Sequence, residues 1–229
     1  LMNLAGYDAM AVGNHDLNFG VERLLELDEL ADFPLLSANV KWKSDGSLVV
    51  QGHTVIDVAG VQVGIFGLTS QETYYKTHPR NIADLVIEAY VPAAQAALKQ
   101  LEAAGADVVI ALVHVGIPDL QLSDADVAYA MEALQGIDLI VDGHSHTVMP
   151  EGLRVGDTWI VQAGEHTKNL GAVVMQVEAG KVVSVEPQLL SKDDVEALEV
   201  EAKAEMLELI AEIEAQQREI TAEVIARVP

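Results

Sequence analysis

The chain has 229 residues and contains no cysteine, which excludes a disulfide framework and any thiolate metal site. Half of the residues are hydrophobic, enough to form the core of one large domain or two small ones. The 36 acidic and 13 basic residues give a formal net charge of −23. This balance argues against binding to a nucleic-acid backbone, and no apolar run is long enough to span a membrane.

The N-terminal half alternates apolar runs with polar loops. Residues 1–6 are typical of the last turn of a helix ended by glycine, so we expect the chain to begin inside a longer protein, and no signal peptide is recognisable. A helix is predicted over Val21–Ala31 from its broad apolar face. Strands are predicted over residues 9–12, 35–40, 48–58 and 61–68, the last two joined by a hairpin at Ala59–Gly60.

The central part predicts buried parallel strands. Residues 69–80 form a polar loop, and the helix predicted over 82–104 should be split or kinked by Pro92. The continuous apolar run Asp107–His114 is typical of a parallel strand buried on both faces. A helix over 123–136 and a second buried strand over 137–141 follow. Short strands, expected to be antiparallel, then cover 153–155, 159–162, 172–178 and 182–187.

Residues 193–228 predict one long helix with a single apolar stripe and three acid–base pairs spaced i,i+4. This helix could dock on the surface by its stripe or connect to a following segment. Coiled-coil dimerisation is less favoured, because a strict heptad lasts only a few turns.

Three predicted strands end in Asn or His. They are followed by Gly13-Asn14-His15-Asp16, by His114-Val115-Gly116 and by Gly143-His144-Ser145-His146. Open α/β sheets bind ligands beyond the carboxyl ends of their strands. We therefore expect one convergent metal site with N and O ligands, whose dications would give so acidic a protein the positive charge that receives a phosphate.

Each of these residues also has a purely structural interpretation. In an extended segment His144 and His146 would point the same way, toward a metal, although two surface histidines are the alternative. His114 is either a buried, hydrogen-bonded histidine or a ligand. Asn14 offers a carbonyl oxygen or forms a turn, and His15 beside it could donate a proton at the mouth of the site.

The remaining histidines are weaker candidates for metal ligands, because no cluster of polar residues at a strand end surrounds them. We expect them to make surface or local hydrogen bonds; they are His53, His78 and His166.

Together these blocks resemble those of the calcineurin-like metallophosphoesterases, G-N-H-[DE], H-x-G and G-H-x-H in this order. Further residues resemble the bacterial 5′-nucleotidase branch, which includes 2′,3′-cyclic-nucleotide 2′-phosphodiesterase/3′-nucleotidases. These are Phe19-Gly20, Gly67-Leu68-Thr69, Gln162-Ala163-Gly164 and Leu170-Gly171. The resemblance covers residues 1–190 and implies an α/β fold, a four-layer α-β-β-α sandwich, truncated at its N-terminus and followed by the long helix.

The resemblance implies a hydrolase with two divalent metal ions, of Mn, Zn, Mg, Ca or Co. Asn14, His114 and His144 would bind one ion and His146 the other. His15 would stabilise the transition state and assist the leaving group. In 5′-nucleotidases an aspartate three residues later pairs with this histidine. Here Asn18 stands at that position, and it can orient the ring without supplying a negative charge.

The family's first two blocks, D-x-H and G-D, are missing from the chain, as is its carboxy-terminal nucleotide-binding domain. We therefore expect a partial catalytic domain over 1–190 and a helix or linker over 191–229, in which phosphoester hydrolysis is impaired. The expected substrate is a nucleotide or another phosphomonoester or cyclic phosphodiester, and the expected location is the periplasm, cell surface or exterior. The alternative is a non-catalytic scaffold or binding domain with a vestigial metal site. Metalloprotease or deaminase chemistry is disfavoured, because no H-E-x-x-H helix or cysteine ligand is present.

Overall fold

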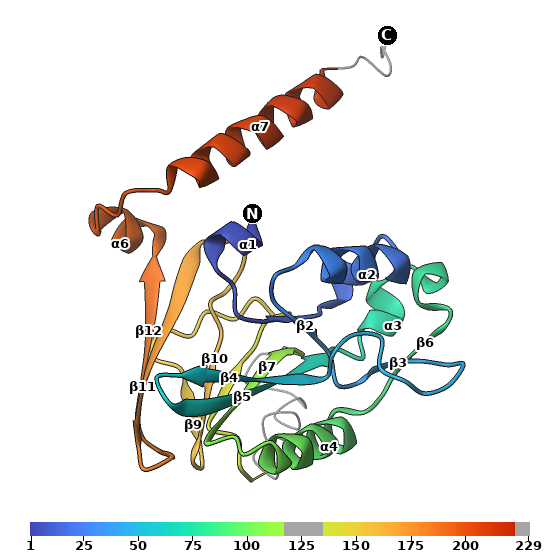
Figure 1. The fold of residues 1–229 in the computed structure, drawn as a ribbon. Helices are drawn as coiled ribbons and strands as arrows, with labels where there is room; N and C mark the ends of the chain where they lie inside the picture. Colours follow the sequence, from blue (N-terminus) through green and yellow to red (C-terminus); the bar gives the residue numbers. More distant parts are fainter. Residues whose placement is uncertain (117–134, 223–229) are drawn as a thin grey trace.

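The computed structural model describes residues 1–116 and 135–222, arranged around a six-stranded sheet (Figure 1). The strand order is β4-β5-β7-β8-β10-β9. The strands are β4 (His53–Val58), β5 (Val61–Thr69), β7 (Val108–His114), β8 (Leu139–Val141), β9 (Leu153–Val155) and β10 (Thr158–Val161). Neighbours β5, β7, β8 and β10 run parallel, and β4 and β9 are antiparallel edges. The carboxyl ends of the four parallel strands therefore lie at one edge of the sheet.

Three two-stranded ribbons and several helices surround this sheet. The ribbons are parallel β1 (Met10–Ala11) with β2 (Leu35–Leu36), antiparallel β3 (Val40–Trp42) with β6 (Leu85–Ile87), and antiparallel β11 (Asn169–Glu178) with β12 (Lys181–Ser191). The helices are α1 (Met2–Ala5), α2 (Val21–Leu30), α3 (Thr73–Lys76), α4 (Tyr90–Ala103), α6 (Lys192–Ala197) and α7 (Ala204–Thr221), with 3-10 turns η1 (Asn14–Leu17) and η2 (Pro79–Ile82). Within the described residues, no helix combines the length and the apolar character needed to cross a membrane.

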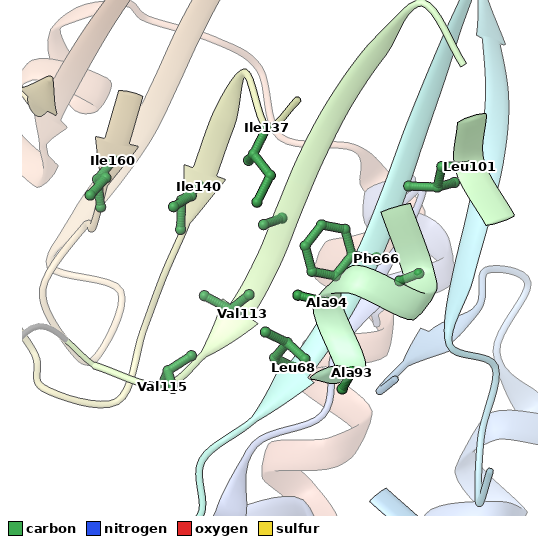
Figure 2. Packing of buried hydrophobic residues seen from close by; sticks show 12 residues of the cluster. Phe66, Leu68, Ala93, Ala94, Leu101, Val113, Val115, Ile137, Ile140 and Ile160 are labelled. Carbon is green, nitrogen blue, oxygen red and sulfur yellow. The ribbon is translucent and has the colours of Figure 1, made fainter. Parts of the chain in front are cut away.

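Helix α4 covers one face of the central sheet (Figure 2). Its small residues Ala93 and Ala94 let it approach closely, and Leu101 packs near its end. From the sheet, alternate residues of neighbouring strands point to this face; they are Phe66, Leu68, Ala111, Val113, Ile140 and Ile160. The two-residue alternation of a strand thus gives the sheet one face for α4 and a second face for the ribbons.

The opposite face is covered by two of the ribbons. Leu36 of β2 lies directly over Gly67 of β5. Side chains of β11–β12 and of β8 and β10 line a common apolar cavity of about 340 Å³. Beyond β1–β2, Leu24 of α2 packs with Leu35. This order of helix, sheet, ribbon and helix agrees with the expected mixed α/β fold with a central sheet, while the second β layer consists of two separate ribbons among the described residues.

Most predicted elements are present, and the differences have local causes. The strand predicted over 35–40 is broken into β2 and β3, because Ser37 and Asn39 turn inward to hydrogen-bond Thr69. The strand predicted over 48–58 begins only at His53. The short strands pair antiparallel as expected, β9 with β10 and β11 with β12, and β10 also joins the central sheet by pairing in parallel with β8.

The prediction of a helix over 82–104 is wrong for the residues before Tyr90. Leu85–Ile87 form a strand paired with β3, and the helix begins at Tyr90. Pro92 therefore lies in the first helical turn, where its missing N–H costs no hydrogen bond, and does not kink the helix.

The prediction of a single long C-terminal helix over 193–228 is also wrong. A capping box of Ser191 and Asp194 begins α6, and the chain leaves the helix near Glu199, which adopts a left-handed φ of 48°. Helix α7 then extends away from the sheets (Figure 1). The helix predicted over 123–136 lies almost entirely outside the described residues, as do residues 223–229.

Candidate metal centre

The polar residues at the strand ends converge at one edge of the central sheet. Asn14 opens η1 three residues after the end of β1, His114 is the last residue of β7, and His144 follows β8 by three residues. Asn14 Oδ1 lies 3.1 Å from His114 Nε2 and 3.1 Å from His144 Nδ1. The predicted contact between these three residues, up to 130 positions apart in sequence, is thus present in the fold.

Asn14 is almost completely buried, with 1% of its surface exposed. Thr77 Oγ1 donates a 2.8 Å hydrogen bond to the Asn14 carbonyl and fixes the backbone behind the side chain. The Asn14 Nδ2 atom is buried without a hydrogen-bond partner in the described structure. Buried amide N–H groups are normally hydrogen-bonded, and this one is not. The contacts of the Asn14 oxygen therefore account for the position of the side chain.

His114 fits between two glycines. A Cβ on Gly13 would lie 3.0 Å from its ring, and a Cβ on Gly143 would lie 3.0 Å from its Nδ1 atom. Burial, followed by the neighbouring His144, His15 and His146, lowers the pKa of His114 to about 4. The ring is therefore neutral near pH 7, the form in which imidazole binds metals.

The loop that carries His144 is held by Asp142 and Gln162. Asp142 Oδ1 accepts hydrogen bonds from the backbone N–H groups of Val115 and Gly116, and Gln162 Nε2 donates to its second oxygen. Burial raises the pKa of Asp142, while these backbone N–H groups oppose the rise. Gln162 Oε1 in turn accepts from Thr147 N at 2.5 Å. The ends of β7, β8 and β10 are thereby locked together.

His144 and His146 diverge, contrary to the extended geometry expected for this segment. Both adopt left-handed backbone conformations, with φ of 77° and 58°. His144 turns inward, with only 8% of its side chain exposed, and its Nε2 lies 2.8 Å from Glu72 Oε2. Lys76, followed by His144, lowers the pKa of Glu72 to about 2. His144 is therefore held between a carboxylate and the Asn14 amide oxygen.

His146 remains at the surface beside the centre. Its side chain is 56% exposed, and its Nδ1 lies 2.8 Å from Glu165 Oε2. His166 lies 3.3 Å from the same carboxylate oxygen, so it is closer to the site than its sequence position suggested.

His15 and Asn18 form the expected pair. The Asn18 amide donates a 2.9 Å hydrogen bond to His15 Nδ1, across one turn of η1. An Nδ1 that accepts this bond carries no proton, so the proton of the neutral ring is on Nε2. Two of the outlying histidines agree with expectation: His78 Nδ1 accepts a local bond from Arg80 N, and His166 is 74% exposed beside its neighbour Glu165.

The residues present fit a divalent cation in their donor types. Two imidazole nitrogens and a carbonyl oxygen suit Zn and Mn. Donors held about 2.1 Å from one ion at right angles lie about 3.0 Å apart, close to the distances around Asn14 Oδ1. Among residues 1–116 and 135–222, however, no three His, Cys, Asp or Glu side chains converge as a metal site. A cation held by His114 and His144 would therefore have the Asn14 oxygen as its third donor.

Sequence reasoning missed the residues that support these donors. Glu72 and Thr77 come from the polar segment after β5, and Glu165 from the loop after β10. Glu72 gave no signal, because an acid in a polar loop is usually solvated. Asp142 could have been found, since it follows the apolar strand β8 directly and two residues before His144.

Comparison with known proteins matches residues 2–148 to the family described as calcineurin-like phosphoesterase. Protein UshA of Yersinia enterocolitica is 33% identical over 214 residues, covering 82% of this chain and 38% of UshA. The 5′-nucleotidase of Rattus norvegicus is 37% identical over 156 residues, covering 66% of this chain and 26% of its own length. The chain thus spans between a quarter and two fifths of these relatives.

Among solved structures, the calcineurin-like phosphoesterase YfkN of Bacillus subtilis matches with a TM-score of 0.79 and 26% identity. The match covers 97% of this chain and 74% of the YfkN chain. The family match extends from before Asn14 to beyond His146, so it includes the ends of β1, β7 and β8. The chain belongs to the calcineurin-like phosphoesterase family.

Proposed function

We propose that this chain carries part of the active centre of a metal-dependent phosphoester hydrolase acting on nucleotides. A 5′-nucleotidase or 2′,3′-cyclic phosphodiesterase/3′-nucleotidase type is favoured. The observation that carries the proposal is the convergence of Asn14 Oδ1, His114 Nε2 and His144 Nδ1 at 3.1 Å. The names of the relatives support the substrate class, since several are 5′-nucleotidases.

Each residue at the centre has a distinct role in this proposal. Asn14, His114 and His144 would hold one divalent ion, and His146 would contribute to a second. When bound, such ions neutralise the phosphate charge and make hydroxide available from water near neutral pH. His15, oriented through Nδ1 by Asn18, would present its Nε2 proton to the leaving-group oxygen.

The types of ligand atom also affect how strongly this chain would bind a metal ion. Because three His, Cys, Asp or Glu groups do not converge among the described residues, the group of three relies on a neutral amide oxygen. Neutral donors compensate less of an ion's charge than carboxylates do. We therefore expect the chain by itself to bind one ion weakly and to turn over slowly.

The test combines metal titration with hydrolysis. Calorimetric titration with Mn²⁺ should give a single weak site that is lost in His114→Ala and retained in His53→Ala, a histidine on β4 outside the centre. Hydrolysis of p-nitrophenyl phosphate and of nucleoside monophosphates should then require Mn²⁺. Equal Mn²⁺ binding by the two variants would overturn the proposal and favour a scaffold with structural histidines.

Two further parts of the proposal concern organisation and location. Residues 1–190 would form the catalytic part, and α6 and α7 would lead toward a further nucleotide-binding domain. The protein would act in the periplasm, at the cell surface or outside the cell. Protease accessibility of the segment between α6 and α7, and fractionation of cells that express the full-length protein, test these two statements.

A further inference from the structure

We propose that Glu72 is the positioning residue of His144. Its carboxylate accepts a hydrogen bond from the Nε2 proton, which leaves Nδ1 unprotonated, with its lone pair facing Asn14 Oδ1. This inference rests on the proposed function, because it assigns the atom through which His144 would bind the ion. It also makes a statement about the metal-free protein that can be tested separately.

The geometry of Glu72 is built into the segment that follows β5. Ser70 is completely buried, its Oγ accepts from Glu72 N at 3.1 Å, and its carbonyl accepts from Thr73 Oγ1 at 2.6 Å. These bonds fix the turn that leads into α3, with Glu72 as its N-cap. The Glu72 carboxylate is thereby brought to 2.8 Å from His144 Nε2, although 72 positions separate the two residues.

The His144 contact is more directional than the second contact of Glu72. Lys76 Nζ lies 2.9 Å from the same carboxylate oxygen, but its side chain is 49% exposed and it is only one helical turn away. Exposed i,i+4 ion pairs of this kind contribute little. The side chain of His144 is only 8% exposed, so its ring cannot exchange the carboxylate freely for water.

The two ring nitrogens of His144 have different partners. A carboxylate can only accept a hydrogen bond, so the contact with Glu72 places the proton of a neutral ring on Nε2. Nδ1 then carries a lone pair that faces Asn14 Oδ1, another acceptor, at 3.1 Å. Two facing acceptors repel each other unless a cation lies near both, so Glu72 prepares the ring for an ion. A carboxylate behind a metal-binding imidazole commonly has this effect on tautomer and orientation.

The experiment reads the tautomer first and metal binding second. In metal-free protein at mildly alkaline pH, the ¹⁵N shifts of the His144 ring should show protonated Nε2 and unprotonated Nδ1. Glu72→Ala should lose this bias, whereas Glu72→Gln should keep much of it, because its amide oxygen still accepts. Mn²⁺ affinity should fall about 10- to 100-fold in Glu72→Ala and less in Glu72→Gln.

Two controls separate a local effect from a loss of charge or fold. Lys76→Met leaves the carboxylate in place and should keep the tautomer. Glu214→Gln, in an exposed ion pair on α7, removes the same charge remotely and should alter neither readout.

The inference is overturned if the wild-type ring carries its proton on Nδ1, or on both nitrogens, or if Glu72→Ala leaves tautomer and affinity unchanged. A wild-type protein that shows the Nε2 tautomer but binds no Mn²⁺ would instead contradict the proposed function. It would leave the assignment of Glu72 as the orienting group intact.

Discussion

Leu36 of β2 lies against the backbone of Gly67 in β5, so that a Cβ on Gly67 would be 2.2 Å from the Leu36 carbonyl oxygen. The two elements are also hydrogen-bonded nearby, since Ala38 N donates to the Gly67 carbonyl at 2.8 Å. This close approach fixes the β1–β2 ribbon, and with it Asn14, relative to the strand end that leads to Glu72.

Gly67→Ala should therefore destabilise the protein. The added methyl group meets backbone rather than a flexible side chain, and overpacking of this kind typically costs about 1–3 kcal/mol. Urea unfolding followed by circular dichroism measures the loss. Gly171→Ala in β11 is the matched control, because its nearest neighbour lies 3.8 Å away, and it should change stability by less than about 0.5 kcal/mol. Equal stability of both variants would contradict the close packing at Gly67.

A helix or strand of this fold could be predicted where its pattern of apolar residues is distinct from that of its neighbours. The strand β7 was predicted to within one residue, because its apolar run is continuous and bounded by Gly105 and Gly116. The strand β6 was missed, since its three apolar residues merge with the periodic pattern of the following helix. The break after α6 could not be predicted, because the left-handed residue that follows the helix is Glu199 and neither Gly nor Pro marks it.

The candidate site, too, could be predicted only in part. The meeting of His114 and His144 could be predicted because their parallel strands end at one edge of the central sheet. Asn14 follows β1 in a separate ribbon, so its place beside them depends on the packing of that ribbon over β5. The inward turn of His144 and the exposed position of His146 could not be predicted, because both residues adopt left-handed backbone conformations in a loop that is hydrogen-bonded to Gln162, the residue after β10. Tertiary contacts, rather than local sequence, decide where these two rings point.

Gln162→Leu should loosen the loop that carries His144. Gln162 is 3% exposed, accepts from Ser145 Oγ and Thr147 N, and donates to Asp142. Loss of this buried polar group should cost about 1–3 kcal/mol of stability and weaken Mn²⁺ binding, because the imidazole is no longer held in place. Unfolding and titration measure the two effects. Gln216→Leu on exposed α7 should change neither, and a Gln162 variant with unchanged Mn²⁺ affinity would argue against this supporting role.

Asn18→Asp should raise the rate of phosphoester hydrolysis by up to about tenfold, if the chain turns over as proposed. A carboxylate 2.9 Å from His15 Nδ1 would stabilise the imidazolium form that protonates a leaving group. The gain should be larger for nucleoside monophosphates than for p-nitrophenyl phosphate, whose leaving group needs less protonation. Asn18→Ala should show the opposite trend. A gain of the same size for both substrates would contradict a role through the leaving group.

Asp138→Asn should stabilise the protein near neutral pH. Burial raises the pKa of Asp138 above its usual 3.8, although its carboxylate accepts from Val109 N at 2.8 Å. A raised folded-state pKa means that the carboxyl group favours folding most in acid and that this contribution is lost as the pH rises through the folded pKa. Asparagine keeps an acceptor for Val109 N without the charge, so its advantage should appear at neutral pH and shrink in acid. Urea unfolding at both pH values measures the difference, with Asp8→Asn as an exposed control of equal charge change. A variant less stable than the wild type at neutral pH would show that the hydrogen bond to Val109 needs the ionised carboxylate more than burial opposes it.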